Sequence, residues 1–266
     1  MALVPDGTNS GIDPDYGPYS LTNADSFYMD ATEITQAQWD VIYQWAVVNG
    51  YTFYNAGSAK TANHPVQGIN WHDYVKWCNA RSEKAGLTPV YCTDDLKTQV
   101  FRTGQMAEPS VRETANGYRV PTTIQWEYAA RGGFANRRFP WGSEIQHGLA
   151  NYYSSVASSY DTSPTRGYHP MYQLGPEPYT SPAGSFPPNG YGLYDMVGNM
   201  WEWCYNPDGH MLLKRVMRGG SWHSSAEDCT FAYREGEDSG FPDSVWNYFV
   251  GFRAILPLSS VVGSGN

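Results

Sequence analysis

The stretch Gly192–Trp203, GLYDMVGNMWEW, places three aromatic side chains, two carboxylates and a Gly-Asn turn signal within twelve residues. Its apolar residues follow neither the helical period nor strict alternation, so periodicity does not explain it. Asp195 and Glu202 bracket a tight turn at Gly198-Asn199, and the carbonyls between them are free to point inward. Two interpretations stay open. Carboxylates and carbonyls suit a hard cation such as Ca²⁺, and the same acids suit a buried turn in which they accept hydrogen bonds from backbone N–H groups.

The overall composition indicates a globular chain rich in ordered loops. Aromatic residues reach 15% and charged residues only 16%, the reverse of what disordered chains show. The mean hydropathy of −0.52 comes from Gly, Asn, Ser, Tyr and Pro rather than from charge, so aromatic side chains are expected to anchor irregular backbone to a core. No internal repeat or linker divides the sequence, and we predict a single domain over residues 1–266.

Charge and hydropathy restrict the kinds of partner. The net charge is −9 and no Lys/Arg cluster occurs, so the sequence predicts no nucleic-acid partner. No apolar run approaches the roughly 20 residues of a membrane span. The start, MALVPDGTNSG, lacks the features of a signal peptide, while a signal or lipid anchor on a longer chain stays possible. The four cysteines form no CxxC pair and leave the redox compartment open.

Capping residues ahead of apolar stripes predict helices over residues 35–50, 70–86 and 122–133. The first and third open with a Thr-x-x-Gln capping box, and the second opens with an Asn N-cap. Within the third, Glu127 is interpreted as a helix-surface acid paired with Arg131 at i, i+4.

Outside these helices the sequence predicts short strands and long loops. Residues 1–30 favour strands between turns, and residues 87–118 favour a hairpin with loop. Residues 139–190 carry little periodic pattern, which is uncommon in a compact domain unless the segment is functional or held by ions and aromatic side chains. Arg215–Arg218 and Gly251–Ile255 are predicted as strands that flank a polar and aromatic insert.

Seven motifs carry a family resemblance: SFYMDATEITQAQW, HPVQGINWHDYVKWCN, GYRVPTTIQWEYAARGG, FPWG, PPNGYGLYDMVGNMWEW, RVMRGGSW and VGFR. Their content and order resemble formylglycine-generating-enzyme-like (sulfatase-modifying factor) domains over roughly residues 20–256. The resemblance implies an α+β chain with the C-type-lectin-type fold of that subclass. Its expected parts are a short twisted antiparallel sheet, two main helices and long ordered loops.

The resemblance also implies a structural calcium ion at the opening stretch. The matching ligands are the side chains of Asp195 and Glu202 and the main chain of Gly198 and Met200, an oxygen-rich set that suits Ca²⁺. A second cation position begins at Asn151 in the family. Asn151 and the nearby Asp161 equally suit turn residues that bond to backbone groups.

The resemblance implies that catalysis would use Cu(I) held by two cysteine thiolates. In the family these cysteines follow a GGS motif and lie five positions apart. Here those positions are Ser224 and Cys229, and a neutral, hard hydroxyl does not replace a thiolate on Cu(I). We therefore predict that the protein is not an enzyme and that Cys229 is a buried structural cysteine. The alternative is a copper-dependent formylglycine-generating oxidase. It would use Ser221 and Trp201, which fall on family active-site positions, with His223 as a substitute ligand.

The chain also resembles variable proteins of diversity-generating retroelements, which diversify side chains near the C-terminus on a lectin-type frame. Frame residues such as RGGSW and GFR flank a variable ligand-binding region at about residues 215–255. Its Tyr, Ser and Asn content is typical of binding surfaces, and exposed aromatics favour a protein or cell-surface ligand and an extracellular or cell-surface location. A non-diversified binder remains an alternative. The predicted ligand-binding residues are His223, Ser224, Ser225, Asp228, Phe231, Tyr233, Asp243, Trp246, Asn247 and Tyr248.

Overall fold

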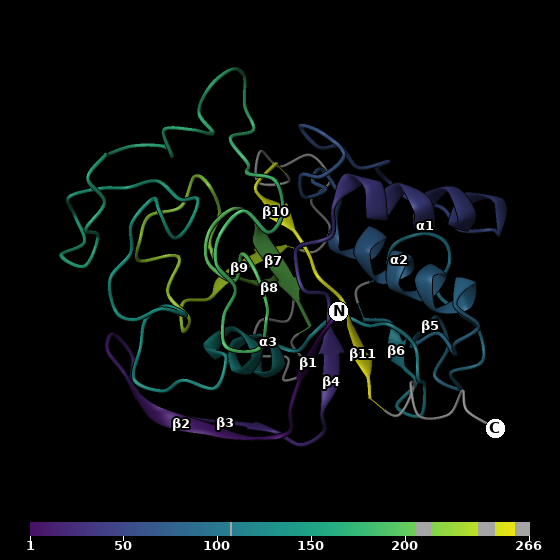
Figure 1. Cartoon of the computed structure of the whole chain (residues 1–266). Coiled ribbons are helices and arrows are strands. Elements are labelled where there is room, and N and C mark those ends of the chain that lie inside the picture. Colours follow the sequence, from purple (N-terminus) through teal and green to yellow (C-terminus); the bar gives the residue numbers. More distant parts are fainter. Residues whose placement is uncertain (107, 206–213, 239–247, 259–266) are drawn as a thin grey trace.

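The computed structural model of the protein describes residues 1–106, 108–205, 214–238 and 248–258 (Figure 1). The helices in these ranges are α1 (Gln36–Val48), α2 (Trp71–Lys84) and α3 (Thr123–Arg131). The strands are β1 (Ala2–Val4), β2 (Gly7–Asp13), β3 (Gly17–Asn23), β4 (Phe27–Met29), β5 (Tyr91–Cys92), β6 (Ser110–Val111), β7 (Trp201–Cys204), β8 (Lys214–Arg218), β9 (Glu235–Asp238), β10 (Val250–Gly251) and β11 (Ile255–Pro257). This arrangement confirms the predicted α+β class.

Two sheets join segments that are far apart in the sequence. In the first, β4 pairs antiparallel with β1 on one side and with β11 on the other. In the second, β7 pairs with β8 and β8 with β9, all antiparallel, while β10 joins β7 in parallel. A parallel pair needs a long crossover, and the chain between β7 and β10, which includes β8 and β9, supplies it. Two hairpins, β2–β3 and β5–β6, complete the strands.

The predicted helix starts are confirmed. Thr35 and Thr122 both close capping boxes, and the Asn70 side chain accepts a hydrogen bond from the backbone of Asp73. Helices α1 and α2 lie side by side and form one flank of the molecule (Figure 1). Between them, the rings of Trp39 and Trp77 stack with centroids 6.0 Å apart. Such aromatic pairs stabilise a core beyond their area burial.

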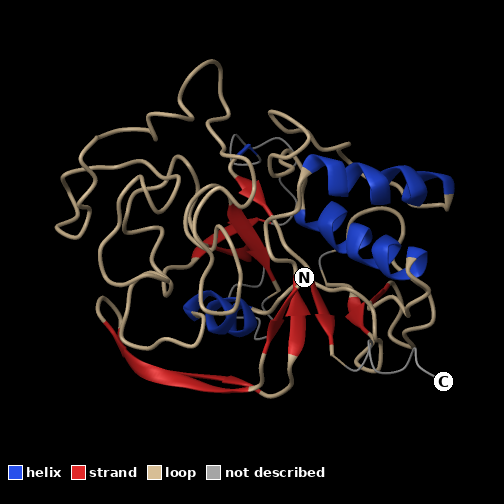
Figure 2. Ribbon diagram, viewed as in Figure 1, coloured by secondary structure: helices blue, strands red, loops and turns tan. Residues whose placement is uncertain are grey.

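The long segment 139–190 contains no helix or named strand, and loops occupy the flank of the molecule opposite α1 and α2 (Figure 2). A small apolar core that includes Phe139, Ile145 and Tyr152 anchors it. Asp161 is a turn residue, because it accepts hydrogen bonds from side chains and backbone of the same segment and pairs with Arg166 at 3.0 Å. The loop is therefore held by its own aromatic and polar contacts.

Candidate functional site

The opening stretch adopts a left-handed turn that leads into β7. Asp195, Gly198 and Asn199 have φ values of 53°, 74° and 64°. A Cβ atom at Gly198 would collide with the backbone of Asn151, so only glycine fits at this close approach. The turn brings Asp195 close to Glu202 of β7, and both side chains are buried.

Glu202 is held by protein donors. Both its oxygens accept hydrogen bonds from the guanidinium of Arg253, at 2.6 to 2.9 Å, and Oε2 also accepts from the indole of Trp126 at 2.7 Å. Asp195 is different, since its Oδ2 accepts from the backbone of Gly184 whereas its buried Oδ1 has no partner. Asp195 therefore has a carboxylate oxygen without a protein partner, whereas Glu202 has none.

A third acid, Glu33, lies at the same place, and sequence reasoning missed it. Its oxygens accept hydrogen bonds from the Asn199 side chain (2.7 Å) and the Met200 backbone (2.9 Å). Burial, together with the negative charges of Asp195 and Glu202, raises the pKa of Glu33 well above its ordinary value. Burial likewise raises the pKa of Asp195 to about 6. Glu33 precedes α1 and is far away in the sequence, so no local pattern signals its role.

The predicted calcium ligands fit a cation only in part. Asp195 and Glu202 lie close enough to act on each other electrostatically, and the unpaired oxygen of Asp195 suits a ligand. Glu202 does not, because Arg253 and Trp126 already occupy its oxygens. In the described part of the chain, no three His, Cys, Asp or Glu side chains form a group that could hold a metal ion. Calcium binding therefore stays a prediction.

The positions that carry the family's thiolates are sealed in the core. Ser224 is 8% exposed, and its Oγ accepts a hydrogen bond from the Ser221 backbone at 3.0 Å. Cys229 is completely buried and packs against Gly220. Burial raises the pKa of the Cys229 thiol, which disfavours the thiolate that binds metals. This burial agrees with the interpretation of Cys229 as a structural cysteine.

Five aromatic side chains gather beside this position, and we call Tyr153, Tyr168, Trp222, His223 and Phe249 the aromatic patch. Ring centroids are 4.9 Å apart between Tyr153 and Tyr168, 5.7 Å between Tyr168 and His223, and 5.1 Å between His223 and Phe249. Trp222 is buried beneath them, while Tyr153 and His223 are exposed. The sequence pointed only to His223, because the two tyrosines belong to the long loop, which has no periodic pattern.

The other predicted ligand-binding residues have mixed positions. Tyr248 is exposed, whereas Ser225 and Asp228 bond to each other and close a half-buried turn. Tyr233 is half-buried, with its ring 5.9 Å from that of Trp201. Phe231 and Ser224 require a correction, since Phe231 is 1% exposed and packs in the core and Ser224 is 8% exposed, so neither presents a surface to a ligand. Three further predicted residues lie outside the described residues: Asp243, Trp246 and Asn247.

Glu127 also differs from its sequence interpretation. The predicted partner is right, because Arg131 donates to Oε1 at 2.8 Å, but the carboxylate is buried rather than on the helix surface. Arg218 from β8 donates to Oε2 at 2.6 Å, and Arg131 also pairs with Asp13. Two guanidinium groups compensate the burial of this acid, as a buried charge requires.

This geometry defines the class of protein. It is a lectin-type scaffold with long, internally bonded loops and an aromatic patch at its surface. Residues 1–257 match the family described as the sulfatase-modifying factor enzyme 1-like domain, and the chain belongs to that family. Within the described ranges, none of the helices has the length and apolar character needed to cross a bilayer.

Two relatives show how far the similarity extends. The chain is 31% identical over 243 residues to the chaperone protein LppX of Paenibacillus barcinonensis, a match covering 88% of this chain and 82% of LppX. It is also 31% identical over 200 residues to the formylglycine-generating enzyme of Mus musculus, a match covering 69% of this chain. That second match covers only 42% of the mouse enzyme, so this chain spans less than half of its length.

Two solved structures share the fold. The crystal structure of CarF superimposes with a TM-score of 0.72 at 26% sequence identity and covers 97% of each chain. Treponema denticola variable protein 1 superimposes with a TM-score of 0.68 at 23% identity, over 97% of this chain and 94% of that one. The second similarity concerns the fold alone.

Proposed function

We propose that this chain is a non-catalytic ligand-binding protein that recognises a protein or cell-surface ligand through the aromatic patch and Tyr248. The observation that carries the proposal is the patch itself, in which half-buried Tyr168 and exposed His223, from two distant segments, rest on buried Trp222. Tyrosine and histidine rings offer large contact areas with few rotatable bonds, so little entropy is lost on binding. A rigid scaffold that presents loops in this way is a common basis for recognition.

The state of the thiolate positions supports a binding role over catalysis. Ser224 provides no thiolate, and burial raises the pKa of the Cys229 thiol. A two-thiolate Cu(I) site therefore lacks one ligand, and the thiolate form of the other is disfavoured. The second candidate, a copper-dependent oxidase, is favoured by one observation: Ser221 and Cys229 are both present and buried, one on each side of Ser224 in the sequence. It requires His223 to complete the copper site.

A diversified binder is the more specific form of the proposal. The fold shared with a variable protein and the exposed residues His223 and Tyr248 support it. It places the protein at the cell surface or outside the cell. The genomic test is a nearby reverse transcriptase with a near-copy of the 3′ coding segment that differs only at adenines. Without such a template, the chain would be a binder that is not diversified by this route.

The direct test uses photo-crosslinking on intact cells and membrane fractions. A photoreactive amino acid replaces His223 in one protein and Tyr54 in a matched control, because Tyr54 is an exposed aromatic residue outside the patch. We expect a discrete crosslinked partner from position 223 only, and its yield should fall when Tyr153→Ala is added. Equal yields from both positions, or no effect of Tyr153→Ala, would contradict the proposal.

A further inference from the structure

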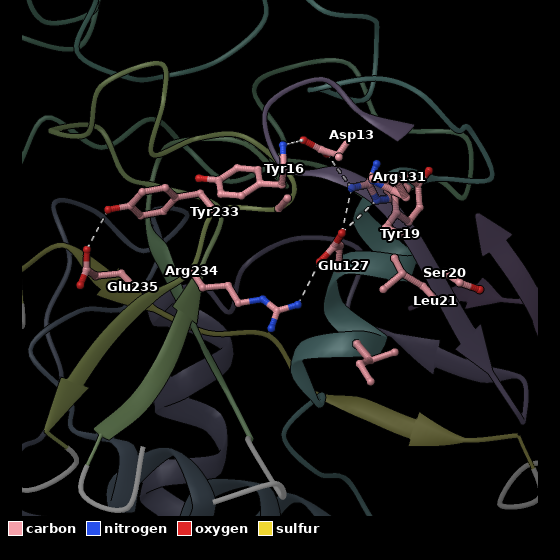
Figure 3. A pocket seen from close by; sticks show the side chains of 14 residues that line it. Asp13, Tyr16, Tyr19, Ser20, Leu21, Glu127, Arg131, Tyr233, Arg234 and Glu235 are labelled. Atoms are coloured by element: carbon pink, nitrogen blue, oxygen red, sulfur yellow. Dashed lines mark hydrogen bonds and ion pairs between the residues drawn. The ribbon is translucent and has the colours of Figure 1, made fainter. Parts of the chain in front are cut away.

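A pocket of about 590 Å³ lies between the β2–β3 hairpin, α3 and residues 232–235 (Figure 3). None of its lining residues belongs to the aromatic patch. Its volume is within the range of about 300–1,000 Å³ that small-molecule sites occupy. The hairpin and α3 face each other across it, so three separate segments of the chain build the pocket.

One arginine of this pocket has no close partner. Arg234 lies 3.7 Å from Oε2 of Glu127, which is beyond hydrogen-bond distance, and its side chain is 55% exposed. Glu127 is already bonded by Arg131 and Arg218, and Arg131 also satisfies Asp13. Among the described residues, Arg234 has no other ion pair or hydrogen bond. Asp13, Glu127 and Glu235 also line the pocket, so the lining carries no surplus positive charge. What Arg234 offers a ligand is its set of unused N–H donors.

The walls near Arg234 are largely apolar. Tyr16 stands above the Arg234 side chain, which extends toward Glu127, whereas Tyr233 turns the other way and donates to Glu235 at 3.0 Å (Figure 3). Leu21 and Ile124 line the pocket on the side of the hairpin and α3. The pocket therefore combines one available cation with aromatic and aliphatic surface.

The surrounding acids decide the charge of the ligand. Asp13 and Glu235 line the pocket, and the charges of Asp15 and Asp228 act on Tyr16 at its rim. A dianion such as a phosphate monoester would be repelled by these groups, because only one arginine is available to balance it. A monoanion needs only that one positive charge.

We propose that this pocket binds a carboxylate carried on an apolar or aromatic body. Arg234 donates paired N–H hydrogen bonds to the carboxylate, as planar guanidinium groups do. Tyr16, Leu21 and Ile124 contact the body. The site goes beyond the proposed function, because it uses a different surface and does not depend on the aromatic patch.

The test uses 3-phenylpropionate and its neutral isostere 3-phenylpropionamide, titrated into the ¹⁵N-labelled protein. We expect the acid to shift the amide signals of Arg234, Tyr16 and Ile124, and to bind at least about tenfold more tightly than the amide, since hydrogen bonds to charged groups are the stronger ones. Arg234→Gln should abolish this preference. The fold should persist because Glu127 keeps Arg131 and Arg218.

Two further variants make the result decisive. Arg102→Gln removes an arginine of similar exposure outside the pocket and should leave the preference intact. Tyr16→Ala should weaken binding of the acid and the amide alike, because it removes a wall rather than a charge. Equal affinity for the two probes, an unchanged acid affinity in Arg234→Gln, signal shifts elsewhere, or tighter binding of 2-phenylethylphosphonate would each overturn the assignment. Absence of binding by the acid would overturn it as well.

Discussion

Arg253 and Glu202 form an ion pair in which both side chains are withdrawn from solvent, with Nη2 and Oε1 2.6 Å apart. Arg253 also donates to the backbone carbonyls of Asp30, Ala31 and Tyr194. A single guanidinium thus links the residues after β4, the opening stretch that runs into β7, and the segment before β11. These three regions are distant in the sequence, and removal of Arg253 affects all of them.

We expect Arg253→Ala to lower the free energy of unfolding by about 3–5 kcal/mol, because it leaves Glu202 buried and unpaired. The measurement is urea unfolding followed by circular dichroism. Arg102→Ala is the control, since Arg102 pairs with Glu83 near the surface and such exposed pairs contribute about 0–1 kcal/mol. Similar losses in the two variants would contradict the role assigned to Arg253.

Calcium is expected to raise the melting temperature at neutral pH. Asp195 is buried with its pKa raised to about 6, so its carboxylate is charged at neutral pH while Oδ1 has no protein partner, and a divalent cation would compensate that charge. Asp195→Asn should reduce the effect, because Oδ1 of Asp195 is the buried carboxylate oxygen without a partner. If chelation and added Ca²⁺ give the same melting temperature, the calcium prediction is wrong.

The buried carboxylate of Glu127 predicts a loss of stability in acid. Burial alone would raise the pKa of Glu127, but Arg218 and Arg131 outweigh it and hold the pKa below its ordinary value of 4.5. The folded state then binds this proton more weakly than the unfolded state. The stabilisation is present above pH 4.5 and is lost as the pH falls through the lowered pKa.

Unfolding free energies measured from pH 7 to pH 3 should therefore decline less steeply in Glu127→Gln than in the natural sequence. At pH 7 the same variant should be less stable by about 3 kcal/mol, because two buried arginines lose their anion. Glu144→Gln, at an exposed position, is the matched control and should reproduce the natural profile. A Glu127→Gln profile parallel to that of the natural sequence would exclude this carboxylate as the cause.

The missing thiolate gives a gain-of-function prediction. The natural protein should not compete with a Cu(I) chelator, whereas Ser224→Cys should do so because it restores the second soft ligand. Ser224→Cys with Cys229→Ser should lose that affinity again. Conversion of a cysteine-bearing peptide to an aldehyde by the natural protein with Cu(I) would show instead that it is an oxidase.

Some features were predictable because they depend on neighbours along the chain. The capping boxes at Thr35 and Thr122 fixed two helix starts, since the bonding groups lie three residues apart. Gly198 was recognisable as a turn residue for the same local reason. The β5–β6 hairpin also fell within the segment where it was expected.

Other features had no local signal. Phe231 has the residue type of a binding surface, but only packing against the core shows that it is buried. Tyr153 and Tyr168 join His223 across more than fifty residues of sequence, and a loop without periodicity does not predict such contacts. Glu127 received its predicted partner, Arg131, yet its burial depends on Arg218 from another element.

The sequence by itself determined the family, the helix starts, the tight turn at Gly198-Asn199 and the replacement of one thiolate by Ser224. These properties follow from residue identity and short-range hydrogen bonding. Only the tertiary structure decided that Glu202 faces Arg253 and that Arg234 lies 3.7 Å from Glu127, beyond hydrogen-bond distance. Those outcomes depend on which charges the fold brings together and removes from water, because the energy of a charge is set by its surroundings and not by its position in the chain.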